Sequence, residues 1–182
     1  MTEQQPVPEA TLADTEHGRT PTSEGWFIVN LTEAFGFRNP SSGAVLPLEG
    51  DDHRFPEVGI NVHVLDPGQQ SCRYHEETGQ EGFLVLHGEC LLLVEEQERP
   101  LRQWDFFHCP GGTRHVFVGA GDGPCAILMI GARPAEERIH YPASELAARH
   151  GASVSEATDV PDEAYADWPG PWEPARLPWL PR

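Results

Sequence analysis

Short apolar runs alternate with polar turns from residue 58 to residue 131. The run "VGINVHVL" (58–65) alternates apolar and polar positions and stops at "DPG". Four more runs follow, "GFLVLHG", "CLLLVEE", "RHVFVG" and "CAILMIGA", separated by sequences rich in Gly, Pro and charge. Because strand side chains alternate between two faces and such separators favour turns, the pattern predicts short antiparallel strands in a sandwich or barrel. This region has no helical 3.6-residue period.

The residues before this pattern divide into two parts. Residues 1–24 are polar and contain three prolines and almost no aromatic side chains, so we expect a disordered arm. The apolar run "WFIVNL" (26–31) is rich in β-forming residues, and we expect order to begin there. These features assign residues 25–132 to a barrel whose core spans about residues 58–132.

The segment after the barrel, residues 133–182, begins with a helix signal. In "PASELAARHG", Ser144 stands at an N-cap position, Glu145 lies in the first turn and Gly151 is a stop signal. These signals predict a short C-terminal helix over residues 143–150.

The end of the chain, "WPGPWEPARLPWLPR" (168–182), is rich in proline and tryptophan. So many prolines exclude regular structure, so we expect none there. Trp168, Trp172 and Trp179 are too apolar to be left in water without a reason. We therefore expect this tail to pack on the barrel or on a partner subunit.

Composition restricts the possible partners and the compartment. The chain has 182 residues, with 29 acidic and 12 basic side chains and a formal net charge of -17. That length suits one domain with tails, and the negative charge disfavours nucleic acids and anionic membranes as partners. The sequence has no long apolar stretch and no secretory signal, so we expect a cytoplasmic protein.

The four cysteines, Cys72, Cys90, Cys109 and Cys125, contain no C-x-x-C pair. In a cytoplasmic protein thiols stay reduced. We therefore interpret all four as small buried residues without a disulfide or a zinc framework.

Potential metal ligands are concentrated in "YHEETGQE" (74–81), just before the apolar run "GFLVLHG". Eight residues supply one imidazole, one phenol and three carboxylates. Carboxylates and imidazoles at the start of a buried strand need a cation or a hydrogen-bond partner, because an isolated buried charge is costly.

This region resembles the first of two sequence motifs of the cupin superfamily. That motif reads Gly, five residues, His-x-His, three or four residues, Glu, six residues, Gly. In this chain Gly68 opens the region, and Glu81 is followed by six residues and then Gly88. The match includes "FLVLHGE", and the chain is similar to a bacterial subgroup with the pattern YHxExxQExFLVLxGE and a helix after the barrel.

The second cupin motif reads Gly, five residues, Pro-x-Gly, two residues, His, three residues, Asn. The sequence "PGGTRH" (110–115) matches this motif through its His. Trp104 replaces the leading Gly and Gly119 replaces the closing Asn. The resemblance implies an all-β fold, the double-stranded β-helix (jelly-roll) barrel, here with a short C-terminal helical extension. It also implies a homodimer formed by exchange of edge strands, for which residues 26–31 are the candidate.

The resemblance further implies one divalent metal ion per chain, held inside the barrel by three imidazoles and a carboxylate. This chain lacks the His-x-His pair, and two registers fit the spacing. Counting five residues after Gly68 places Tyr74 and Glu76 in the ligand positions. One extra loop residue places His75 and Glu77 there instead.

Ligand chemistry favours one register. A neutral imidazole binds metal at physiological pH, whereas a phenol must first lose a proton with a pKa of about 10. We therefore favour His75, Glu77, Glu81 and His115 as ligands of Mn, Fe, Ni or Zn, with Tyr74 and Glu76 as the alternative register.

Several other residues are candidates for the pocket. Strand alternation places Phe83 and Val85 on the face of Glu81, and Phe117 on the face of His115. His63 is a further candidate lining residue, and Gln80 could support the metal or bind it.

The function that these features favour is a small-molecule metalloenzyme of the oxygenase, isomerase or lyase type. Glu77 or Glu76 is the candidate base. The alternative is a non-catalytic protein that binds a small metabolite, with or without a metal. A scaffold role through the Trp/Pro tail is a third hypothesis.

Overall fold

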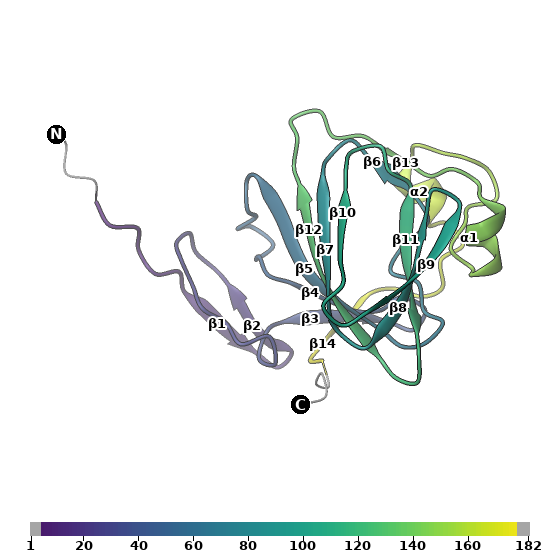
Figure 1. Cartoon of the computed structure of the whole chain (residues 1–182). Coiled ribbons are helices and arrows are strands. Elements are labelled where there is room, and N and C mark those ends of the chain that lie inside the picture. Colours follow the sequence, from purple (N-terminus) through teal and green to yellow (C-terminus); the bar gives the residue numbers. More distant parts are fainter. Residues whose placement is uncertain (1–4, 178–182) are drawn as a thin grey trace.

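The computed structural model describes residues 5–177, and most of their regular structure is β-strand (Figure 1). Its largest sheet has seven strands, in the order β10-β7-β12-β5-β4-β3-β14. These are β10 (Phe106–Cys109), β7 (Glu81–His87), β12 (Cys125–Ala132), β5 (Val58–Leu65), β4 (Gly43–Pro47), β3 (Gly36–Asn39) and β14 (Glu173–Ala175). All neighbouring strands in this sheet are antiparallel.

A second sheet faces the first and has the order β11-β8-β9. Its strands are β11 (His115–Ala120), β8 (Glu89–Val94) and β9 (Gln97–Arg102). A two-stranded ladder of β6 (Glu76–Glu77) and β13 (Ile139–His140) lies at one end of the two sheets (Figure 1). The arrangement confirms the all-β jelly roll, built as two facing sheets.

The main hydrophobic core fills the space between these sheets. Alternate residues of β7, β11 and β12 point into it, because successive strand side chains point to opposite faces. Phe83 and Val85 meet Phe117 and Ile127 there, and all four are almost fully buried. These side chains therefore fill the space between the two sheets, up to the end of the barrel where β6 and β13 lie.

The outer face of the large sheet is covered over part of its area. Val62, Ala126 and Leu46 form a second buried cluster with Ala34. Residues 29 and 31, the end of the run "WFIVNL", pack against this cluster. The run forms no strand of its own, and Ile28 is 80% exposed.

The N-terminal segment differs from the expectation of a disordered arm. A hairpin of β1 (Leu12–Thr15) and β2 (Gly18–Pro21) extends from the body of the molecule (Figure 1). Its contacts with the body include backbone hydrogen bonds between Arg19 and residues 33 and 35, and the His17 ring packs against Phe35. No apolar pattern in the sequence indicates this hairpin, because its partners lie in segments that are not adjacent to it in the chain.

The C-terminal segment contains the expected helix. Helix α1 (Glu145–Arg149) lies within residues 143–150, and the Ser144 hydroxyl accepts a hydrogen bond from the Ala147 N–H. This bond satisfies one of the free N–H groups at the helix start. A second short helix, α2 (Pro161–Ala164), follows.

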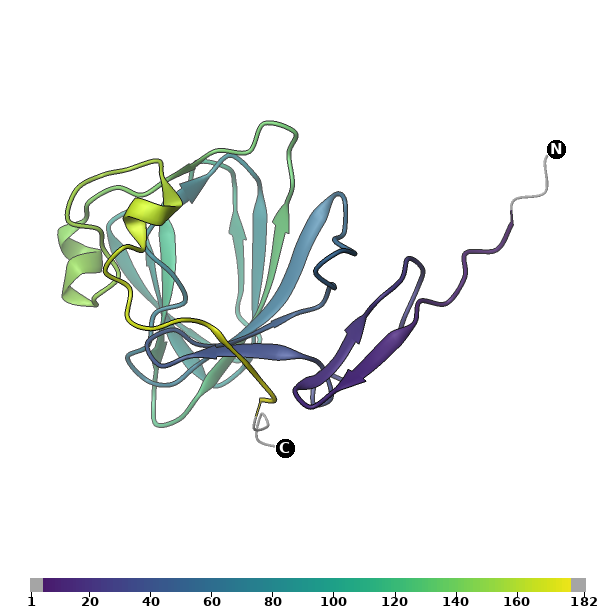
Figure 2. The ribbon, with the colours of Figure 1, turned by 180° about the vertical axis from the view of Figure 1, so that it is seen from behind.

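The tail packs on the body, but its lack of regular structure was predicted wrongly. Strand β14 pairs with β3 (Figure 2). Its Pro174 is tolerated because β14 is an edge strand, where a missing N–H costs little. Trp168 lies over Arg73, and the Trp172 ring lies 6.3 Å from the His63 ring. Trp179 lies outside the described residues.

Two turns have backbone angles that are unusual for their residues. Glu95 and Glu96 join β8 to β9 with φ angles of 47° and 58°. Hairpin turns of this kind favour Asn or Gly, so the two glutamates are strained. Trp104, which stands where the cupin motif has Gly, has a φ of 76°. The positive φ of that position is therefore kept without the glycine that would adopt it most easily.

All four cysteines are free thiols, and Cys90, Cys109 and Cys125 are buried as expected, whereas Cys72 is only partly buried. No helix within residues 5–177 is long and apolar enough to cross a lipid bilayer.

His63 is a polar residue on the inner face of β5, between Val45 of β4 and Ile127 of β12. Within the described residues its Nδ1 atom is buried and has no hydrogen-bond partner. Burial lowers the pKa of His63 from 6.5 to about 4. The folded protein therefore holds this imidazole neutral at a pH where the unfolded chain protonates it.

Acidification should therefore destabilise the protein partly through His63. As pH falls from about 6.5 towards 4, the unfolded state gains a proton that the folded state does not, so the free energy of unfolding decreases. In urea unfolding between about pH 7.5 and about pH 4.5, His63→Gln should lose about 2 to 3 kcal/mol less stability than wild type. The exposed His108→Gln variant should behave like wild type. Equal losses in wild type and His63→Gln would contradict this assignment.

Candidate metal centre

Two histidines from separate parts of the chain are brought together by the backbone. His115 is the first residue of β11, and His75 directly precedes β6. Each donates its N–H to the carbonyl oxygen of the other, at 3.2 Å from His75 and 2.8 Å from His115. This pairing places the two side chains on one face, with ring centroids 4.9 Å apart.

Two carboxylates complete the cluster. Glu81 begins β7, and its Oε2 lies 3.5 Å from His115 Nε2. Glu77 ends β6, and its Oε1 lies 3.4 Å from His75 Nε2. One possible ligand atom each from His75, Glu81 and His115 lies within 4.8 Å of the others, and Glu77 stands beside this group.

The other ring nitrogens of both histidines are held by the backbone. His75 Nδ1 lies 2.8 Å from the Arg73 carbonyl oxygen, and His115 Nδ1 lies 3.1 Å from the Thr113 carbonyl oxygen. An imidazole that donates from Nδ1 keeps its Nε2 lone pair free. In both rings Nε2 is the atom that faces the carboxylates, as in proteins that bind metal through histidine.

Burial makes the two carboxylates costly without a cation. The Glu81 side chain is 13% exposed, and that of Glu77 is 23% exposed. Burial and the neighbouring Glu77 raise the pKa of Glu81 to about 7. The hydrogen bond from His75 lowers the pKa of Glu77 despite its burial. A divalent ion would stabilise both charges, so the donor set fits a metal.

The two imidazoles have pKa values shifted in opposite directions. Burial and the neighbouring His75 lower the pKa of His115 to about 4. Burial also acts to lower the pKa of His75, but Cys72 and Glu77 outweigh it and raise the value well above 6.5. His115 is therefore the neutral member of the pair and has an Nε2 lone pair available to a metal, whereas His75 would release its Nε2 proton on binding one.

The alternative register points away from this cluster. Tyr74 is fully buried in a separate cluster with Leu93 and Val116, and its hydroxyl accepts the Glu96 N–H. Glu76 lies on the outer side and pairs with Arg114 at 2.9 Å. The structure therefore brings together His75, Glu77, Glu81 and His115, and it places Tyr74 and Glu76 elsewhere.

The candidate pocket residues divide by depth. The Phe83 and Phe117 rings lie 5.1 Å and 6.3 Å from the His115 ring, so they form the floor of the cluster. Val85 is one inward-facing position deeper in the same core. His63 lines the inner face of β5 but does not touch the cluster. Gln80 is exposed and reaches neither the metal cluster nor the pocket wall. It falls on the opposite side of the chain from Glu81 because side chains alternate.

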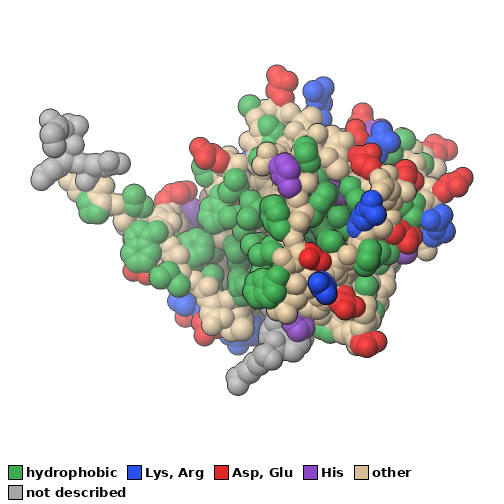
Figure 3. All heavy atoms as spheres, viewed as in Figure 1, with side chains coloured by type: hydrophobic (Ala, Val, Ile, Leu, Met, Phe, Trp, Pro, Cys, Tyr) green, Lys and Arg blue, Asp and Glu red, His purple; other side chains and the backbone are tan. Residues whose placement is uncertain are grey.

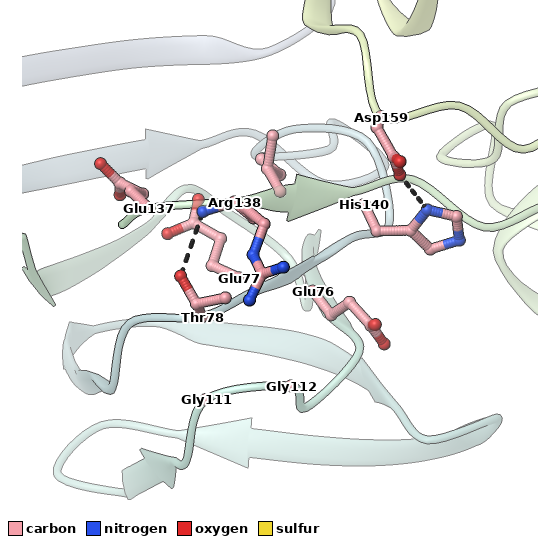
Figure 4. Close-up of a pocket in the computed structure, with 10 residues that line it drawn as sticks. Glu76, Glu77, Thr78, Gly111, Gly112, Glu137, Arg138, His140 and Asp159 are labelled. Atoms are coloured by element: carbon pink, nitrogen blue, oxygen red, sulfur yellow. Dashed lines mark hydrogen bonds and ion pairs between the residues drawn. The ribbon is translucent and has the colours of Figure 1, made fainter. Parts of the chain in front are cut away.

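A pocket of about 720 Å³ opens beside β6 and β13 and borders the cluster at Glu77 (Figure 4). Its lining includes the positively charged Arg138, which is exposed, and negatively charged carboxylates. One of these, Asp159, has a carboxylate oxygen 2.5 Å from the His140 Nδ1 atom. The full lining consists of Glu76, Glu77, Thr78, Gly111, Gly112, Glu137, Arg138, Ile139, His140 and Asp159.

Three residues lie near the histidines that the sequence did not predict as part of the site. The Cys72 and Cys109 sulfur atoms lie 3.6 Å and 3.5 Å from the Nδ1 atoms of His75 and His115. The Tyr141 ring lies 5.9 Å from the His75 ring. Cys109 directly precedes "PGGTRH" and could have been found from that position. Tyr141 comes from a distant segment, and its local sequence contains no signal of this contact.

Comparisons with known proteins assign the barrel region to a family. Residues 61–131 match the Cupin_2 family, described as a cupin domain. No curated protein matches the chain. A solved putative sugar phosphate isomerase from Acidithiobacillus ferrooxidans is 28% identical, with 57% of this chain and 68% of that chain covered and a TM-score of 0.50.

Two further solved structures are similar. A sugar phosphate isomerase of the cupin superfamily from Silicibacter pomeroyi is 30% identical, with 56% of this chain and 65% of that chain covered and a TM-score of 0.50. This chain therefore spans just under two thirds of that protein. A polyketide cyclase from Streptomyces resistomycificus is 14% identical, with 79% and 94% covered and a TM-score of 0.54, and this likeness concerns the fold alone. The family match, the fold and these similarities show that the chain contains a cupin domain.

Proposed function

We propose that this protein is a metal-dependent enzyme that isomerises a small hydroxy-carbonyl compound of the sugar phosphate class. The observation that carries the proposal is the convergence of His75 Nε2, His115 Nε2 and the Glu81 carboxylate at one buried position. These three residues would hold one divalent ion. Such an ion would polarise a carbonyl or hydroxyl oxygen of the substrate.

Glu77 is the candidate base in this proposal. Its pKa is lowered, so its carboxylate is ionised at neutral pH, and it is the most exposed acidic group of the cluster. It also borders the pocket from which a substrate would approach. A carboxylate there can take a proton from the carbon beside a carbonyl group and return it to the former carbonyl carbon, while the hydroxyl proton passes to the former carbonyl oxygen. Glu76 is less suited, because Arg114 occupies its carboxylate.

The choice of an isomerase over an oxygenase or a lyase rests on similarity. Both isomerase structures are 28% to 30% identical to this chain over more than half of its length. Arg138 in the pocket supplies a cationic group that could face a phosphate.

The metal site predicts a stoichiometry that depends on particular residues. Protein purified without a His tag should contain about one Mn, Fe, Ni or Zn per chain by elemental mass spectrometry. His115→Ala and Glu81→Gln should retain less than about a tenth of it, because each removes one of the three ligands. Glu76→Gln is the matched control and should keep full occupancy. A wild-type protein that takes up none of the four ions would contradict the proposal, as would loss of metal in the control.

Isomerisation predicts exchange of a carbon-bound proton with solvent. The metal-loaded enzyme, incubated with sugar phosphates in D2O, should incorporate deuterium beside the carbonyl group, detectable by NMR. Glu77→Gln should lower the rate by about a hundredfold or more and keep the metal, because it removes only the base. If metal-loaded wild type exchanges and converts none of the sugar phosphates, it is a metabolite-binding protein or an enzyme of another class.

We also propose that two copies of the chain associate through the outer face of the large sheet. Figure 3 shows apolar side chains gathered on this face, next to the N-terminal hairpin. Phe106 is 66% exposed and covers Gly82, which pairs with the exposed Ile130. A second copy suits this face, since a two-fold axis would lay each protruding hairpin on the partner's apolar surface.

This association predicts a dimer in light scattering at micromolar concentration. Phe106→Glu should shift the mass to that of one chain, because it places a charge in the apolar contact. Val160→Glu changes an exposed valine on the C-terminal segment and should stay dimeric. A monomeric wild type, or a dimeric Phe106→Glu, would count against this interface.

A further inference from the structure

The position of His75 depends on the C-terminal segment. His75 follows a loop, and on one side it is fixed by its backbone pairing with His115. On the other side, the loop lies against residues 141–168, which include α1 and α2 (Figure 1). The N–H of Tyr74 bonds to the Ala152 carbonyl oxygen, and the N–H of Arg73 bonds to the Tyr165 hydroxyl at 3.1 Å.

Arg73 is the main attachment between this loop and the C-terminal segment. Its side chain is 7% exposed, and it pairs with the Asp167 carboxylate. It also donates to three backbone carbonyl oxygens, those of Ala164, Gly151 and Ser153, at 3.0 to 3.2 Å. Among the described residues, every hydrogen-bond acceptor of this guanidinium therefore comes from residues 151–167. A buried cation is stable only with such partners, so the position of the C-terminal segment relative to Arg73 is fixed by these bonds.

Aromatic rings extend from Arg73 back to His75. The Arg73 guanidinium lies 4.4 Å from the centre of the Trp168 ring. Trp168 contacts Tyr165 at a ring distance of 5.3 Å, and Tyr165 contacts Tyr141 at 5.8 Å. Tyr141 is buried and lies 5.9 Å from His75. Because the Arg73 carbonyl oxygen accepts from His75 Nδ1, these contacts form a closed ring around the imidazole.

We propose that Tyr141, Tyr165, Trp168 and Arg73 are positioning residues that set the orientation of the His75 imidazole. The C-terminal segment then helps to orient a metal ligand, in addition to packing on the barrel. Orienting groups behind a ligating histidine commonly change metal affinity by 10- to 100-fold. The inference rests on the proposed metal site, but it makes a separate claim about how one ligand is held.

The test compares metal affinity with stability in four variants of the full chain. Tyr165→Phe removes only the hydroxyl that accepts the Arg73 N–H, and Trp168→Leu removes the ring over the guanidinium. Trp168→Phe keeps an aromatic ring and should recover most of the wild-type behaviour. Val62→Ala opens a small cavity on the far side of the large sheet and serves as the stability control. Mn²⁺ and Co²⁺ affinities are measured by titration calorimetry far below each thermal midpoint.

Tyr165→Phe and Trp168→Leu should bind Mn²⁺ about tenfold more weakly than wild type, and the Co²⁺ absorption spectrum should change. Val62→Ala should keep wild-type affinity although its thermal midpoint falls. The inference is overturned if Tyr165→Phe and Trp168→Leu bind like wild type. It is overturned also if Val62→Ala weakens binding equally, because destabilisation alone would then explain the loss.

A second readout separates this inference from the proposed metal function. If wild type binds no ion, the metal proposal fails, and the imidazole is then examined by NMR in the metal-free protein. The His75 Nδ1–H resonance should be protected from solvent exchange in wild type and Val62→Ala, and lost in Trp168→Leu. Equal protection in all three proteins would show that the C-terminal segment does not hold His75.

Discussion

Two backbone hydrogen bonds between His75 and His115 determine where the candidate site can form. They join a loop to the first residue of β11, and the direction of both side chains follows from that pairing because neighbouring residues alternate in facing. The same alternation sends Tyr74 into a separate core and Glu76 to the surface. Glu81 then approaches from the opposite sheet, since β7 faces β11 across the core. A slip of one residue in this pairing would replace an imidazole with a phenol.

The site lies at the boundary between a packed core and the solvent. Phe83 and Phe117 fill the space beneath the histidines, so water cannot surround the cluster from below. The carboxylates stand where one side is apolar and the other opens toward Glu77 and the pocket. A cation at that position would be poorly solvated and strongly attracted, because both charges interact in a medium less polarisable than water. The fold thereby supplies an electrostatic environment that the four side chains alone would lack.

The sequence revealed the parts of the protein that depend on local pattern. Strand alternation and turn composition indicated the jelly roll, and Ser144 with Glu145 indicated α1. The motif spacings around Glu81 and His115 were enough to indicate two members of the cluster. Residues 74–77 left two registers open, since the choice depends on what Tyr74 and Glu76 contact. The partners of Tyr74 lie in β8, β11 and the turn at residues 95–96, and that of Glu76 is Arg114, just before β11.

Long-range contacts explain what the sequence did not reveal. The N-terminal hairpin and β14 pair with segments that are far away in the chain, and strand preference at such places depends on the tertiary neighbours more than on the residues themselves. Gln80 was misplaced because one position along a strand decides between core and solvent. The contact of Tyr141 with His75 likewise depends on how the C-terminal segment crosses the sheet.

The ring of contacts around His75 has a consequence for the order in which the protein becomes functional. Arg73 and Tyr165 are 92 residues apart, so this contact closes a long loop and must wait until residue 165 has been synthesised. During synthesis the ribosome releases all the candidate ligands before it releases the residues that hold His75. A nascent chain that has emerged only through β12 therefore has the core strands and the metal-binding atoms, but not the segment that fixes their arrangement. Maturation of the site accordingly requires residues 141–168, and a chain stalled or clipped before them would have a loosely held imidazole.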